Sequence, residues 1–165
     1  MNKQLRQYIA LACAAAAYYI IHEGAHLLYA LACGTFRQIN FMGLGIQIDV
    51  FADQMTAGQM GVFCLAGPAA TLVAAYALTA AADTICRHPS AVFKACMYYV
   101  TLALLFLDPL YLSLLCGFVG GGDMNGISLL FPEAIARILF GGVAFLNALL
   151  FFRRTLPKYK TAFLR

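Results

Sequence analysis

The sequence predicts an all-α polytopic integral membrane protein with about four transmembrane helices and a short β-hairpin between the first and the second. Of its 165 residues, 63% are hydrophobic and only 11% are charged, whereas a soluble domain is about half apolar and a quarter charged. The apolar residues gather in stretches long enough to cross a bilayer, which takes about 20 residues each. We therefore expect one membrane-embedded domain, residues 1–165, with the lipid bilayer as a partner and no nucleic acid.

The first predicted span covers residues 8–33. It follows a basic start at Lys3 and Arg6, and its apolar run is interrupted only by one polar turn, residues 22–26. A basic start before an apolar run is also typical of a cleaved signal peptide. This stretch of about 25 residues exceeds a signal-peptide core and is long enough to span, so we expect a retained helix.

A β-hairpin is predicted at residues 36–50, between the first and second spans. Polar and apolar residues alternate cleanly from Ile46 to Val50, as they do in a strand with one buried face. The segment Met42-Gly43-Leu44-Gly45 supplies the turn.

The remaining predicted spans are residues 58–82, 91–116 and 134–152. The second span is rich in small residues, which let helices approach closely inside a membrane. A polar loop, residues 83–90, follows it, and we expect Asp108-Pro109 to interrupt the third span. Before the fourth span, three glycines precede Asp123 and form a turn that opens a new helix.

The charged residues separate into two groups along these spans. With four spans, most of the basic residues lie on one side of the membrane, and the positive-inside rule then predicts that both termini are cytoplasmic. The basic group is Lys3, Arg6, Arg87, Lys94 and the tail residues Arg153, Arg154, Lys158, Lys160 and Arg165, and the opposite group is Arg37, Asp49, Asp53, Asp123 and Glu133.

The sharpest chemical feature is the motif His22-Glu23-Gly24-Ala25-His26 in the first span. Residues four apart on a helix lie on one face, so both imidazoles can reach one zinc ion. Glu23 then lies where it can act on a metal-bound water without itself binding the metal. Charged groups inside a membrane are costly and need a partner. The alternative interpretation is a polar turn that packs against Asp108 or Asp123 and joins helices.

A catalytic zinc usually has three protein ligands and one open position. The third ligand must come from another part of the chain, and position alone leaves Asp123 and Asp108 as alternatives. Asp108 is also a candidate for orienting a ligand histidine. Asn125 is a candidate donor to a developing oxyanion, or alternatively a helix cap.

These features together resemble the site-2 protease family of intramembrane zinc metalloproteases, most closely its small M50B-like members. The resemblance covers residues 8–152 and rests on HExxH in an apolar span, a glycine-containing hairpin, Ala66-Gly67-Pro68 in a small-residue span, and Gly122-Asp123 opening a later helix. It implies that His22, His26 and Asp123 bind Zn²⁺ and that Glu23 is the catalytic base. The implied activity is a zinc endopeptidase that cuts transmembrane or membrane-associated protein substrates.

The sequence departs from the family pattern in two places. The aspartate motif reads Gly-Asp-Met-Asn-Gly where the family has Leu-Asp-Gly, and the asparagines that often flank Ala-Gly-Pro are absent. Family members also commonly open the active site toward the cytoplasm, whereas the charge pattern places this motif nearer the opposite face.

Two other functions are compatible with this architecture. One is a catalytically silent member that binds transmembrane helices as a regulator or chaperone. The intact His22, Glu23, His26 and Asp123 argue against it, because a binding module has no use for a general base. The other is a small metal transporter, which one buried site without a further histidine relay supports poorly.

Overall fold

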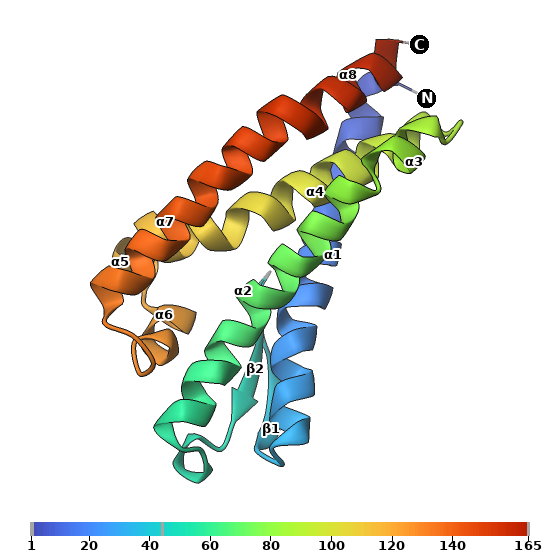
Figure 1. Ribbon diagram of the computed structural model, residues 1–165. Helices are drawn as coiled ribbons and strands as arrows, with labels where there is room; N and C mark the ends of the chain where they lie inside the picture. Colours follow the sequence, from blue (N-terminus) through green and yellow to red (C-terminus); the bar gives the residue numbers. More distant parts are fainter. Residues whose placement is uncertain (1, 44, 165) are drawn as a thin grey trace.

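The computed structural model describes residues 2–43 and 45–164, and in this part of the chain it is mainly α-helical with one two-stranded sheet. Both ends of the chain and the short helix α3 (Ala82–Arg87) lie at one end of the molecule, and the sheet lies at the other (Figure 1). The main basic regions of the sequence thus meet at one end.

Helix α1 (Lys3–Ala32) begins at the N-cap Asn2, whose side chain accepts a hydrogen bond from the backbone N–H of Gln4. Strands β1 (Phe36–Met42) and β2 (Gly45–Val50) follow and pair antiparallel. The hairpin predicted at residues 36–50 is therefore confirmed. Gly43 in its turn has a φ of 62°, a left-handed conformation that favours glycine.

After a short 3₁₀ turn, η1 (Ala52–Gln54), helix α2 (Ala57–Ala80) begins with a capping box formed by Thr56 and Gln59. The predicted polar loop at residues 83–90 is wrong in its first half, because α3 forms a further helical turn there. Helix α3 packs against the C-terminal part of the chain through the buried core of Ala82, Ile85 and Tyr159. This long-range contact stabilises a helix that the local sequence does not predict.

The third span does not break where we predicted. Helix α4 (Ala91–Leu110) contains Pro109 in its last turn, and the helix runs on through a π-helical turn, η2 (Tyr111–Leu115), into α5 (Cys116–Val119). A wider π turn accommodates the backbone after a proline. The hydroxyl of Ser113 donates to the carbonyl of Pro109 at 2.6 Å and satisfies one of the polar groups there.

The last span is longer than residues 134–152. After the short helix α6 (Gly122–Ile127), the helices α7 (Glu133–Leu150) and α8 (Leu156–Leu164) are joined by a π-helical turn, η3 (Phe151–Thr155), into one helix of 32 residues. The basic tail, which we expected to follow the span, is therefore helical as far as the structure describes it.

Three helical segments are long and apolar enough to cross a membrane: Ala57–Ala80, Ala91–Val119 and Glu133–Leu164. This is consistent with a membrane protein. Helix α1, at 30 residues, is also long enough, but its polar turn lowers its hydropathy. A fourth span formed by α1 stays a prediction.

Helices α1, α2 and α4 pack against one another, and α6 packs against α2. Small residues allow α6 to lie close to α2. A Cβ added at Gly126 of α6 would collide with Cys64 of α2, and one added at Gly61 of α2 would collide with Leu130, in the turn that follows α6. These close approaches hold α6 beside α2 and so position Asp123, which lies in its first turn.

Candidate metal centre

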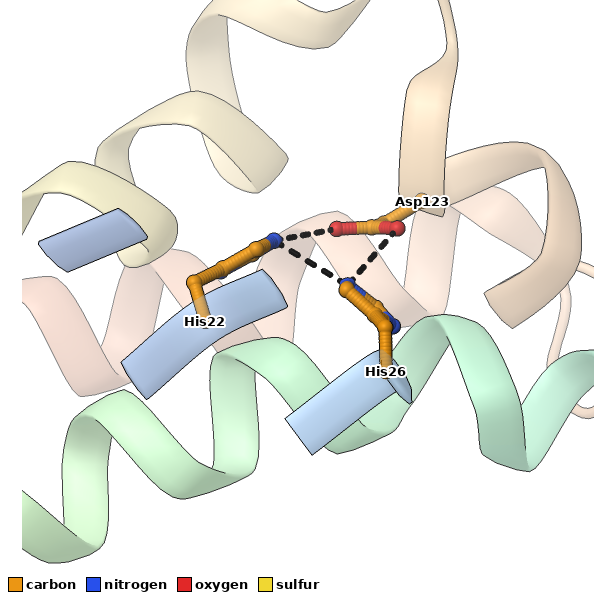
Figure 2. A group of neighbouring side chains, drawn as sticks. All are labelled: His22, His26 and Asp123. Carbon is orange, nitrogen blue, oxygen red and sulfur yellow. Dashed lines mark hydrogen bonds and ion pairs between the residues drawn. The ribbon is translucent and has the colours of Figure 1, made fainter. Parts of the chain in front are cut away.

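His22 and His26 lie one helical turn apart on α1, and both are buried, with 6% and 3% of their surface exposed. Asp123 reaches them from α6 (Figure 2). The Nε2 atoms of the two histidines are 3.1 Å apart, and a carboxylate oxygen of Asp123 lies 3.1 Å from His22 Nε2 and another lies 3.5 Å from His26 Nε2. The structure thus brings together three of the residues singled out from the sequence.

The other ring nitrogen of each histidine already has a partner. His26 Nδ1 lies 2.7 Å from the carbonyl oxygen of Phe63, which can only accept a hydrogen bond. His22 Nδ1 lies 3.2 Å from a carboxylate oxygen of Asp108. A neutral imidazole that donates through Nδ1 presents a lone pair at Nε2. Two such lone pairs and a carboxylate therefore converge, and this arrangement of acceptors is suited to a cation.

The spacing of these atoms fits zinc. Ligands about 2.0–2.1 Å from a tetrahedral zinc ion lie roughly 3.3 Å from one another. The two Nε2 atoms are 3.1 Å apart, and they lie 3.1 and 3.5 Å from different oxygens of the Asp123 carboxylate. Two imidazoles and one carboxylate also match the ligands of many catalytic zinc sites, in which the fourth position holds water. These three side chains could therefore hold a metal ion, and their donor atoms suit zinc.

Asp108 contacts Nδ1 of His22, on the opposite side of the ring from the Nε2 atom that faces His26 and Asp123. Its side chain is 1% exposed. Its carboxylate also accepts hydrogen bonds from the hydroxyls of Tyr18 and Thr71, each at 2.5 Å. Of the two roles considered for Asp108, the geometry corresponds to orienting a ligand histidine. Tyr18 and Thr71 were not identified from the sequence, because a lone hydroxyl in an apolar helix gives no signal of its partner.

Gly67 of α2 lies directly against the ligand atoms. A Cβ added at this position would lie 2.5 Å from His26 Nε2 and 2.8 Å from His22 Nε2. Such contacts are too short for any side chain. The central residue of Ala66-Gly67-Pro68 is therefore small because α2 passes over the two imidazoles.

Glu23 lines a cavity of about 540 Å³ together with all three members of the metal group. Its carboxylate accepts a hydrogen bond of 3.3 Å from the backbone N–H of Ile48 on β2. Residues 47–50 of β2 line the same cavity. One edge of β2 pairs with β1, and in the described sheet the other edge has no strand partner.

Asn125 also lines the cavity and is exposed. It does not cap α6, because the residue at the N-cap is Gly121 and Asn125 lies within the helix. The capping alternative is wrong, and the proposed contact with an oxyanion stays a prediction. Tyr111 lines the same cavity and was not identified from the sequence; its hydroxyl donates to the carbonyl of Gly120 at 2.7 Å.

No family model, curated protein or solved structure matches this chain. An assignment of function therefore depends on the geometry of its own residues.

Proposed function

We propose that this protein is an intramembrane zinc endopeptidase of the site-2 protease type, which hydrolyses peptide bonds of transmembrane or membrane-associated protein substrates. The observation that carries the proposal is the convergence of His22 Nε2, His26 Nε2 and the Asp123 carboxylate within 3.5 Å of one another. These atoms open onto a cavity that Glu23 also lines. Two of the helical segments that line it, Ala57–Ala80 and Ala91–Val119, are long and apolar enough to cross a bilayer.

His22, His26 and Asp123 would hold the zinc ion. When bound, zinc acts as a Lewis acid and lowers the pKa of a water molecule in its open position toward about 7. Asp108 keeps His22 in the tautomer that presents Nε2, and the Phe63 carbonyl does the same for His26.

Glu23 is the general base. Its carboxylate faces the cavity, is half-buried, and is held at one oxygen by the N–H of Ile48. It takes a proton from the attacking water and returns that proton to the leaving amine. An acceptor that is already oriented by a backbone N–H needs little reorganisation when the proton arrives.

The substrate binds in an extended conformation beside β2. A helical substrate hides its amide groups in its own hydrogen bonds, so the segment to be cut must first unwind. The edge of β2 that faces the cavity offers backbone groups to an extended peptide, as in other cases of strand addition. This places the peptide next to Glu23 and the metal group, which line the same cavity.

The test combines metal content with cleavage. The purified wild type is expected to contain about one zinc per chain, and His26→Ala to contain far less. His88→Ala serves as a matched control, because His88 lies at the C-cap of α3, at the opposite end of the molecule from the sheet. Glu23→Gln is expected to keep zinc and to lose cleavage of single-span reporter proteins tagged at both ends.

The outcomes separate the candidate functions. A wild type that binds no zinc overturns the metal site. A wild type that binds zinc, captures the reporters and leaves them intact supports the catalytically silent regulator instead. Full cleavage by Glu23→Gln excludes Glu23 as the base.

A further inference from the structure

A groove of about 360 Å³ lies at the end of the molecule farthest from the sheet, between the start of α1, the first half of α4 and α8. Its walls are mainly aromatic and aliphatic, and three cationic residues border it. The lining residues used below are Lys3, Arg6, Tyr98, Leu156, Lys160 and Phe163.

Among residues 2–43 and 45–164, no acidic side chain neutralises the cations of this groove. None of the ion pairs found in the described residues involves Lys3, Arg6 or Lys160. The lining contains no Asp or Glu side chain among residues 2–43 and 45–164. The acidic residue Asp83 lies at the same end of the molecule, on α3, but Lys158 binds it at 2.6 Å.

The groove is preformed by contacts between helices that are distant in the sequence. The ammonium group of Lys94 on α4 donates to the carbonyl of Ala162 at 3.0 Å and so holds the end of α8 against α4. The guanidinium of Arg6 lies 5.5 Å from the centre of the Phe163 ring, in a cation–π contact that joins α1 to α8. A ligand would therefore meet a site whose walls are already in place.

We propose that this groove binds an anionic phospholipid of the surrounding leaflet. The phosphate contacts Lys3, Arg6 and Lys160, and the upper part of an acyl chain lies on Tyr98 and Leu156. A soluble phosphate would use the cations and leave the apolar walls exposed, whereas an anionic amphiphile satisfies both. The groove also lies where the basic residues from both ends of the chain come together. Basic residues gather in the same way on the side of a membrane protein that faces an anionic surface.

The test is lipid retention by the intact protein. The detergent-purified chain is incubated with equal amounts of phosphatidylglycerol and phosphatidylcholine with identical acyl chains, and bound lipid is counted by native mass spectrometry. The wild type is expected to retain phosphatidylglycerol about tenfold over phosphatidylcholine. The triple variant Lys3→Gln, Arg6→Gln, Lys160→Gln is expected to show almost no preference. The single variant Lys160→Gln, at an exposed position of α8, should lose part of it.

A control variant loses the same number of charges outside the groove. The triple variant Arg87→Gln, Arg153→Gln, Arg154→Gln removes three exposed cations from α3 and η3, none of which lines the groove. It should keep the wild-type preference. Equal losses in both triple variants, a wild type without preference, or displacement of the lipid by millimolar glycerol phosphate would each overturn the proposal. Because no step measures proteolysis, the result is independent of the proposed activity.

Discussion

Asp108 and Asp123 bind opposite edges of the same imidazole, that of His22. Asp108 lies 3.2 Å from Nδ1, and Asp123 lies 3.1 Å from Nε2. The two carboxylates come from different elements, α4 and α6, so the ring links them across the site. Because Asp108 is also fixed by Tyr18 and Thr71, the orientation of His22 depends on packing between α1, α2 and α4.

Asp108→Asn is expected to weaken zinc binding about 10–100-fold, since residues that orient a metal ligand usually have effects of this size. Tyr18→Phe, which leaves the carboxylate in place, should have a smaller effect. Competition with a chromogenic chelator measures both affinities. Asp83→Asn, at an exposed acidic residue on α3, is the control. Stoichiometric zinc in Asp123→Ala together with none in Asp108→Ala would reverse the two assignments.

Gly67→Ala is expected to abolish zinc binding while the helices stay folded. The new methyl group would occupy the space next to His22 Nε2 and His26 Nε2, so the rings must turn away. Metal analysis and circular dichroism of the same sample separate these effects. Gly58→Ala is the matched control, because a Cβ there meets no atom within 4 Å. Normal zinc content in Gly67→Ala would show that the rings tolerate the methyl group.

Ile48→Pro removes the N–H that donates to Glu23 and blocks the free edge of β2. We expect a loss of cleavage of about tenfold or more, with zinc content unchanged. Ile48→Ala keeps the N–H while shortening the side chain, and it should retain more activity than the proline variant. Equal activity in Ile48→Pro and the wild type would exclude strand addition at β2.

Asn147→Ala tests the packing of α7 rather than the metal site. Asn147 is 1% exposed, donates to the carbonyl of Leu105 at 2.6 Å and accepts from the hydroxyl of Tyr76 at 2.9 Å. Its removal should lower stability by about 1 kcal/mol, the usual size of one interhelical hydrogen-bonding group in a membrane. Thermal unfolding in detergent measures the change, and Leu146→Ala, on the exposed face of α7, serves as the control. An unchanged Tm would show that these bonds contribute nothing net.

The sequence was sufficient for those features that depend on local spacing. The four-residue separation of His22 and His26 predicts a shared helix face, and the alternation from Ile46 to Val50 predicts β2. Both follow from the geometry of one element, and the structure contains both.

Features that depend on contacts between elements were missed or misjudged. The choice between the two aspartates needs the relative positions of α4 and α6, which no local pattern contains. The contact of Gly67 with the two imidazoles could not be predicted for the same reason. Glycine is common in helices rich in small residues, so its presence alone does not show what it packs against. Proline usually interrupts a helix, so the sequence predicted a break in the third span at Pro109. The π-helical turn that follows Pro109 lets the helix continue.

The 32-residue helix Glu133–Leu164 is also longer than the hydrocarbon layer of a bilayer is thick. At about 1.5 Å per residue it measures roughly 48 Å, whereas the hydrocarbon layer of a bilayer is about 30 Å thick. Glu133 and Arg153, at either end of its first 21 residues, lie about 30 Å apart along the axis. A charged residue therefore lies at each end of a stretch about as long as that layer is thick, and the helix continues beyond Arg153 to Leu164. Its length alone exceeds what is needed to cross a bilayer, and the excess lies at the basic end of the chain.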